Sequence, residues 1–209
     1  GMGKELADAF PAAKAVFDEV DAALGEKLSA LIWGGAIEEL TLTANAQPAL
    51  MAVSLAAARA LEAGFGVKIS TAAFVAGHSL GEYSALAAAG ALSVTDAARL
   101  LRNRGQAMQA AAPAGTGAMA ALIGKVDVEA AEIIALEAGG AGTVVVANDN
   151  NVGNVVISGS KAGVEAAIAV AKAKGFKAIS LPVSAPFHSP LMAPAAVEME
   201  AALAAATIN

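Results

Sequence analysis

The stretch Gly77-His78-Ser79-Leu80-Gly81 decides the fold of this chain. It follows residues 72–76, an apolar run of strand length, and it precedes residues 82–89, whose small and apolar side chains favour a helix. The pattern therefore predicts a strand, a sharp turn and a helix. In that setting G-x-S-x-G is a nucleophile elbow, because the glycines permit the tight turn and the serine hydroxyl projects at the end of the strand. Such an arrangement suits acyl transfer.

The same serine has a second interpretation. Ser79 and Glu82 have the spacing of a capping box, in which a serine hydroxyl accepts a hydrogen bond from a helix amide. The motif alone leaves both interpretations open.

The composition limits the kind of protein. With 209 residues the chain is long enough for one domain with a subdomain, and its hydrophobic fraction of 57% with only 4% aromatic residues favours closely packed helices. The chain has no cysteine, which excludes thiolate catalysis, disulfides and Cys-type zinc sites. Two histidines are too few for most His-rich metal sites.

The charge limits the partners. A net charge of -6 argues against a general nucleic-acid binder, because the neutralisation of phosphates requires a broad basic surface. No apolar run reaches the membrane-spanning length of about 20 residues, and no basic start precedes a signal-type core. We therefore expect a cytoplasmic chain that binds neither nucleic acid nor membrane.

The pattern of elements changes after residue 113. Up to that point, besides the strand at residues 72–76, the sequence predicts helices at residues 3–24, 48–63, 82–89 and 95–112 and short helical turns at 28–40. Beyond it the sequence predicts strands at 117–124, 143–147, 154–159 and 176–183, with helices at 126–138 and 160–174. The resulting order, βαββαβ, is ferredoxin-like. We expect an α/β protein with a small ferredoxin-like subdomain at residues 114–180 and a large catalytic subdomain at residues 1–113 and 181–209.

Two residues lie where packing does not explain them. Arg104 lies on or beside the apolar stripe of the predicted helix 95–112, and a buried guanidinium needs an anion, supplied either by the protein or by a ligand. His188 lies in a proline-punctuated loop at residues 182–194, where it is either a base for a distant serine or incidental. The sequence pattern leaves both questions open.

Five short motifs occur one after another in the chain. They are Gly-His-Ser-Leu-Gly-Glu-Tyr-Ser at 77–84, Arg-Gly-Gln at 104–106, Gly-Ala-Met-Ala at 117–120, Asn-Val-Val-Ile-Ser-Gly at 154–159 and Pro-Val-Ser-Ala-Pro-Phe-His at 182–188. In order and approximate spacing they resemble the bacterial malonyl-CoA:acyl-carrier-protein transacylases. The resemblance implies an α/β-hydrolase-like large subdomain with a parallel sheet, and an inserted ferredoxin-like small subdomain.

The resemblance also implies the chemistry of the site. Ser79 resembles the nucleophile that forms a malonyl-serine intermediate, and His188 resembles the base that accepts its proton. The backbone N–H of Leu80 is the implied oxyanion donor, and Arg104 matches the arginine that pairs bidentately with the malonyl carboxylate.

Two further residues and the partners follow from the same resemblance. Phe187 resembles the bulky residue placed against the malonyl methylene, and we expect Met108 to line the same pocket. The implied partners are malonyl-CoA and acyl carrier protein in fatty acid biosynthesis. CoA and phosphopantetheine enter as substrates, and no metal or redox cofactor is expected.

The chain departs from the family pattern at its ends. Family members begin with a strand and a Gly-Gln-Gly-Ser-Gln loop that supplies a second oxyanion contact, whereas this chain opens at Gly1-Met-Gly-Lys4. They also continue beyond Asn209, so we expect an incomplete copy. The alternatives are a serine esterase or thioesterase, in which water replaces the carrier thiol, and an inactive carrier-binding fragment.

Overall fold

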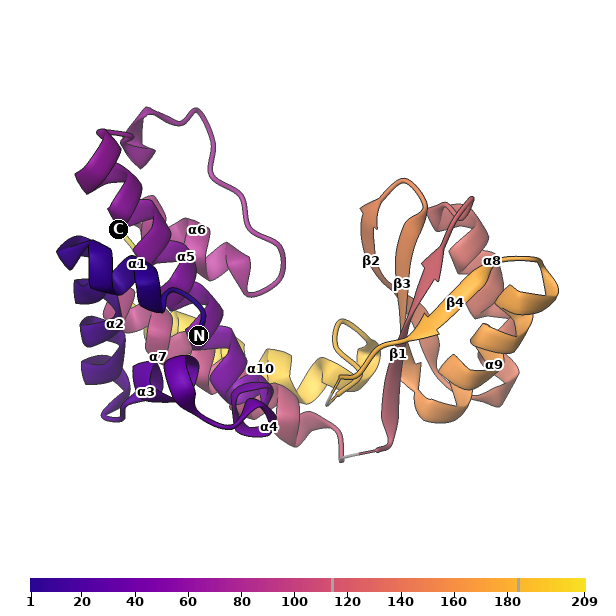
Figure 1. Cartoon of the computed structure of the whole chain (residues 1–209). Helices are drawn as coiled ribbons and strands as arrows, with labels where there is room; N and C mark the ends of the chain where they lie inside the picture. The colour runs from indigo at the N-terminus through magenta and orange to yellow at the C-terminus, as the bar shows by residue number, and fades with distance from the viewer. Residues whose placement is uncertain (114, 184) are drawn as a thin grey trace. The chain divides into compact units, whose positions relative to one another are not determined.

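The structure is a computed structural model that describes residues 1–113, 115–183 and 185–209. These residues divide into two compact units (Figure 1). Unit 1 contains residues 1–106 and 199–209, and unit 2 contains residues 107–198. The roles that the sequence suggests for its subdomains, catalytic for 1–113 with 181–209 and ferredoxin-like for 114–180, stay predictions.

Unit 1 is built from helices. They are α1 (Lys4–Ala9), α2 (Pro11–Leu24), α3 (Leu28–Gly34), α4 (Ile37–Leu40), α5 (Thr43–Phe65), the 3-10 turn η1 (Ile69–Thr71), α6 (Gly81–Ala88), most of α7 (Val94–Ala111) and the end of α10 (Ala193–Ala204). The largest buried side chains come from α2, α3, α5 and α7: Phe17, Ile32, Met51 and Leu101. Alanines of α5 and α7 are also fully buried, which lets these helices pack closely.

Helix α5 begins earlier than the sequence predicts. It starts at Thr43, and Pro48 lies inside it. Its first turn is closed by the N–H groups of Asn45 and Ala46, which both donate to the Leu42 carbonyl at 2.8 Å. The expectation that Pro48 opens the helix is therefore wrong, because one turn of α5 precedes the proline.

Helix α5 also has the length and composition of a membrane-spanning helix. One such helix is weak evidence for a membrane, because a core helix meets the same criteria. Met51, Ala52 and Ala56 of α5 are fully buried within unit 1. Helix α5 therefore contributes one buried face to the core of unit 1.

The strand predicted before the elbow does not form. Residues 72–77 carry no strand, and the loop between η1 and α6 is drawn without an arrow (Figure 1). Among the described residues the only sheet is antiparallel, so the parallel sheet expected for the large subdomain is absent from them. An isolated extended segment becomes a strand only when a neighbouring strand bonds its backbone, and no described segment does so here.

Unit 2 contains a four-stranded sheet in the order β2-β3-β1-β4. Its elements are β1 (Gly117–Ile123), α8 (Val128–Ala138), the 3-10 turn η2 (Gly139–Ala141), β2 (Val144–Asn151), β3 (Asn154–Ser160), α9 (Lys161–Ala173), β4 (Lys177–Ser180), the 3-10 turn η3 (Pro190–Met192) and the start of α10. All three strand pairs are antiparallel. The chain order β1, α8, β2, β3, α9, β4 is the βαββαβ order that the sequence predicts.

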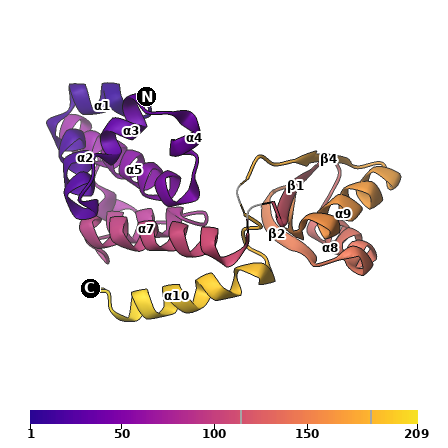
Figure 2. The ribbon, with the colours of Figure 1, turned by 90° about the horizontal axis from the view of Figure 1, so that it is seen from below.

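Helices α8 and α9 lie side by side on one face of that sheet (Figure 2). The alternating side chains of β1 and β3 that face them are buried with apolar residues of both helices, among them Leu122, Ile134, Val155, Ile157 and Val164. Both helices begin at a side-chain cap, because Asp127 and Ser160 accept hydrogen bonds from the Ala130 and Gly163 amides at 2.8 and 3.2 Å. The chain is thus a mixed α/β protein.

Candidate active site

The G-x-S-x-G motif forms a tight turn in front of α6. Ser79 has a φ of 54°, in the left-handed region that residues with a Cβ rarely adopt. The turn is closed by the Gly81 N–H, which donates to the His78 carbonyl at 2.8 Å. A Cβ on Gly77 would overlap the backbone of Gly81 and Glu82, so this position needs glycine. The positive φ of Ser79 and the glycine-dependent turn before α6 are two features of a nucleophile elbow, whereas the strand that precedes such a turn is not formed here.

The capping interpretation of Ser79 fits this geometry poorly. Helix α6 begins at Gly81 with Leu80 as its N-cap residue, so Ser79 lies one position before the cap. Its Oγ accepts a hydrogen bond from Nη2 of Arg104 at 3.1 Å. The half-buried Leu80 follows the serine directly, so its N–H lies on the same turn.

Arg104 is held beside Ser79 by neutral groups. Its Nη1 donates to Oε1 of Gln47 at 2.5 Å, and its guanidinium carbon lies 5.9 Å from the centroid of the Tyr83 ring, a cation–π contact. Burial lowers the pKa of Arg104, and the nearby Tyr83 and Glu82 partly offset this. Burial in turn raises the pKa of Tyr83. Within the described residues Arg104 makes no ion pair, whereas Arg102 on the same helix pairs with Glu26.

Gln47 is a site residue that the sequence analysis missed. Its side chain is 4% exposed, and its Nε2 donates to Oγ1 of Thr43 at 2.8 Å. A helix that began at Pro48 would exclude both residues, and the i, i+4 pair between them is therefore visible only once α5 begins at Thr43.

Gly105 brings α7 close to the first turn of α5. A Cβ on Gly105 would lie 2.5 Å from the Cα of Ala44 and 2.6 Å from the Thr43 carbonyl oxygen. This close approach places Gln47 against Arg104. The sequence signal for this contact between α7 and α5 is a glycine in the middle of a helix, directly after an arginine on or beside the apolar stripe.

Unit 2 holds the remaining candidate residues. His188 is exposed and has a φ of 57°. Among the described residues only Ser79 and His188 combine a side chain with a positive φ. Met108 and Phe187 belong to one apolar cluster with Ala112, Ala185 and Met192. The structure therefore groups Ser79, Leu80 and Arg104 in unit 1, and Met108, Phe187 and His188 in unit 2.

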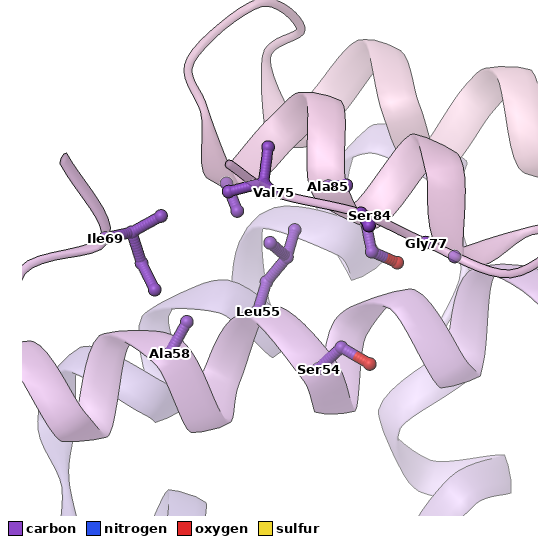
Figure 3. Close-up of a pocket in the computed structure, with 11 residues that line it drawn as sticks. Ser54, Leu55, Ala58, Ile69, Val75, Gly77, Ser84 and Ala85 are labelled. Atoms are coloured by element: carbon purple, nitrogen blue, oxygen red, sulfur yellow. The ribbon is translucent and has the colours of Figure 1, made fainter. Parts of the chain in front are cut away.

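A pocket of about 300 Å³ lies beside the elbow in unit 1 (Figure 3). Residues of α5, η1, α6 and the loop between η1 and α6 line it: Ser54, Leu55, Ala58, Ile69, Val75, Ala76, Gly77, Gly81, Ser84, Ala85 and Ala88. The Ser84 Oγ is buried without a hydrogen-bond partner in the part of the chain that the structure describes. The lining has no ionisable side chain, so a charged acyl group is better matched by Arg104 than by this pocket.

No cluster of three metal-ligating side chains occurs within residues 1–113, 115–183 and 185–209.

Comparisons with known proteins agree with the motifs. The sequence model of a family described as acyl transferase domain matches residues 1–209. The malonyl CoA-acyl carrier protein transacylase of Bacillus subtilis strain 168 is 52% identical over 212 residues, covering 100% of this chain and 65% of its own length. The chain thus spans about two thirds of the length of this curated relative.

Solved structures give the same result. An acyl-carrier-protein-S-malonyltransferase from Bartonella henselae is 55% identical with a TM-score of 0.95, and the match covers 100% of this chain and 67% of that one. A malonyl-transacylase solved in complex with the holo acyl carrier protein of a type II PKS is 42% identical with a TM-score of 0.94, again over 100% and 67% of the two chains. The chain therefore belongs to the acyl transferase domain family, among the malonyl CoA-acyl carrier protein transacylases.

Proposed function

We propose that the protein transfers a malonyl group from CoA to the phosphopantetheine thiol of acyl carrier protein, as a malonyl-CoA:ACP S-malonyltransferase of fatty acid biosynthesis. Its relatives at 52% and 55% identity carry the names of this activity. The similar transacylase solved with a carrier protein supports a carrier as the second substrate.

The observation that carries the proposal is the 3.1 Å approach of Arg104 Nη2 to Ser79 Oγ. In a malonyl ester of Ser79 the free carboxylate lies one methylene beyond the ester carbonyl, within reach of a guanidinium beside the hydroxyl. Arg104 makes no ion pair with the described residues, and its fork of N–H donors suits a carboxylate bidentately. A general esterase needs no cation in its acyl site.

The reaction that we propose has two halves. Ser79 Oγ attacks the thioester carbon of malonyl-CoA, its proton passes to His188, and the C–S bond breaks as the CoA thiolate takes that proton. The carrier thiol then gives its proton to His188 and attacks the malonyl-serine carbonyl. Ser79 Oγ leaves with the proton, which restores the enzyme.

The oxyanion and the acyl group have their own contacts in this proposal. The Leu80 N–H, on the turn after Ser79, donates to the oxygen that becomes negative in each half-reaction. Phe187 and Met108 belong to one apolar cluster, which supports a role of both against the malonyl methylene. A bulky wall there disfavours a branched acyl group.

The proposal also includes the fold of the large subdomain and the cellular location of the protein. The elbow at Ser79, followed by α6, supports an α/β-hydrolase-like large subdomain in the full-length protein. The solved relatives support a soluble, cytoplasmic enzyme.

The test is a transfer assay with the intact protein, malonyl-CoA and holo acyl carrier protein, read by the mass of the carrier. A carrier heavier by one malonyl group supports the proposal. Release of free malonate with unmodified carrier indicates a thioesterase. Neither product, with retained carrier binding, indicates an inactive carrier-binding protein.

A further inference from the structure

His188 has a backbone conformation that its own side chain disfavours. Its φ is 57°, and the only other described residue with a side chain and a positive φ is Ser79. Such conformations persist where the surrounding structure holds them. The loop around His188 must therefore contain the groups that keep this residue in the left-handed region.

A buried serine next to His188 forms a hydrogen bond across the histidine. Ser189 is 8% exposed, and its Oγ donates a hydrogen bond of 2.8 Å to the Pro186 carbonyl. This bond closes a four-residue turn, residues 186–189, across Phe187 and His188. The Ser189 carbonyl accepts a bond of 2.9 Å from the Met192 N–H, which joins the turn to η3.

Both ends of this turn are fixed within unit 2. A Cβ on Gly117 of β1 would overlap the Pro186 ring, so the proline lies directly on the strand. At the other end Met192 is buried in the apolar cluster of Met108, Ala112 and Ala185. The exposed His188 side chain thus projects from a turn whose flanks are anchored and whose centre is bridged by Ser189.

We infer that Ser189 is a positioning residue, whose hydrogen bond to Pro186 holds His188 in the orientation that proton transfer requires. The catalytic consequence rests on the proposed function, because it assumes that His188 is the base. The structural consequence does not, because the bond constrains the His188 backbone whatever that side chain does.

Three variants of the intact protein test the inference. Ser189→Ala removes the bond, and Ser189→Thr keeps the hydroxyl at a φ of −116°, which suits a branched residue. Ser158→Ala is the matched control: Ser158 is fully buried in the same unit, and its Oγ has no hydrogen-bond partner among the described residues. The readouts are the proton NMR signal of the His188 Hε1, assigned by its loss in a His188→Gln variant, and the rate of malonyl-enzyme formation.

We expect Ser189→Ala to shift or broaden the His188 signal, to leave the His78 signal unchanged, and to slow malonyl-enzyme formation roughly 3- to 10-fold, the usual effect of one hydrogen bond. Ser189→Thr should restore both readouts, and Ser158→Ala should match the wild type.

A wild-type His188 signal in a folded Ser189→Ala protein overturns the inference, whatever the rate. Equal slowing in Ser158→Ala also overturns it, because the effect is then a general loss of packing. An altered His188 signal with an unchanged rate, together with wild-type acylation in His188→Ala, supports the bridge and refutes the proposed base.

Discussion

Replacement of Arg104 by alanine should reduce the preference of the protein for malonyl-CoA over acetyl-CoA. The guanidinium is half-buried, 3.1 Å from the Ser79 Oγ, and its neighbours Gln47 and Tyr83 carry no charge to compete for it. A hydrogen-bonded pair with a charged group contributes about 1.5 to 3 kcal/mol. At about 1.4 kcal/mol per tenfold, kcat/KM for malonyl-CoA should fall roughly 10- to 150-fold.

Acetyl-CoA lacks the carboxylate, so its transfer should stay unchanged or increase in the Arg104→Ala variant. The assay compares kcat/KM for the two thioesters in the same preparation, with acyl carrier protein as acceptor. Arg102→Ala is the control, since Arg102 lies on the same helix but pairs with Glu26. Equal losses for both thioesters in Arg104→Ala would show that Arg104 is structural and that the reasoning fails.

Two other predictions concern the groups around this arginine and the elbow. Gly77→Ala should destabilise the protein by about 1 to 3 kcal/mol, because the new Cβ would overlap the backbone of Gly81 and Glu82. Gly81→Ala is the control, since a Cβ there meets open space. Thermal unfolding measures the stability of both variants, and equal stability would contradict the geometry. Gln47→Ala should lower kcat/KM for malonyl-CoA about 3- to 10-fold and leave kcat/KM for acetyl-CoA unchanged, because the Arg104 side chain loses the hydrogen bond that holds it in place. Steady-state kinetics test this, and a parallel loss for both thioesters would refute it.

The sequence predicts those parts of the molecule that depend on local patterns. The βαββαβ order of unit 2 follows from the alternation of apolar residues and from the Ser160 cap, which is present. Several motifs that agree in order predict the family, and the family model and the curated relatives confirm it. The position of Arg104 on or beside its apolar stripe predicts only that the guanidinium needs an anion. The structure gives it neutral partners, Gln47 and Ser79, and no ion pair among the described residues.

The errors arise where structure depends on distant partners. Residues 72–76 have the composition of a strand, but no described strand pairs with them. The sequence does not predict the contact of Gln47 with Arg104, because Pro48 favours a helix start after Gln47. The actual start of α5 at Thr43 depends on backbone hydrogen bonds to the Leu42 carbonyl. Neither feature is encoded by the periodicity of the segment itself.

The most direct test of the central claim is the site of malonylation. The intact protein is mixed with malonyl-CoA without a carrier, and its peptides are mapped by mass spectrometry. We expect one malonyl group on Ser79, absent in Ser79→Ala and discharged when holo acyl carrier protein is added. A malonyl group on another residue, or one that persists in Ser79→Ala, would contradict the account.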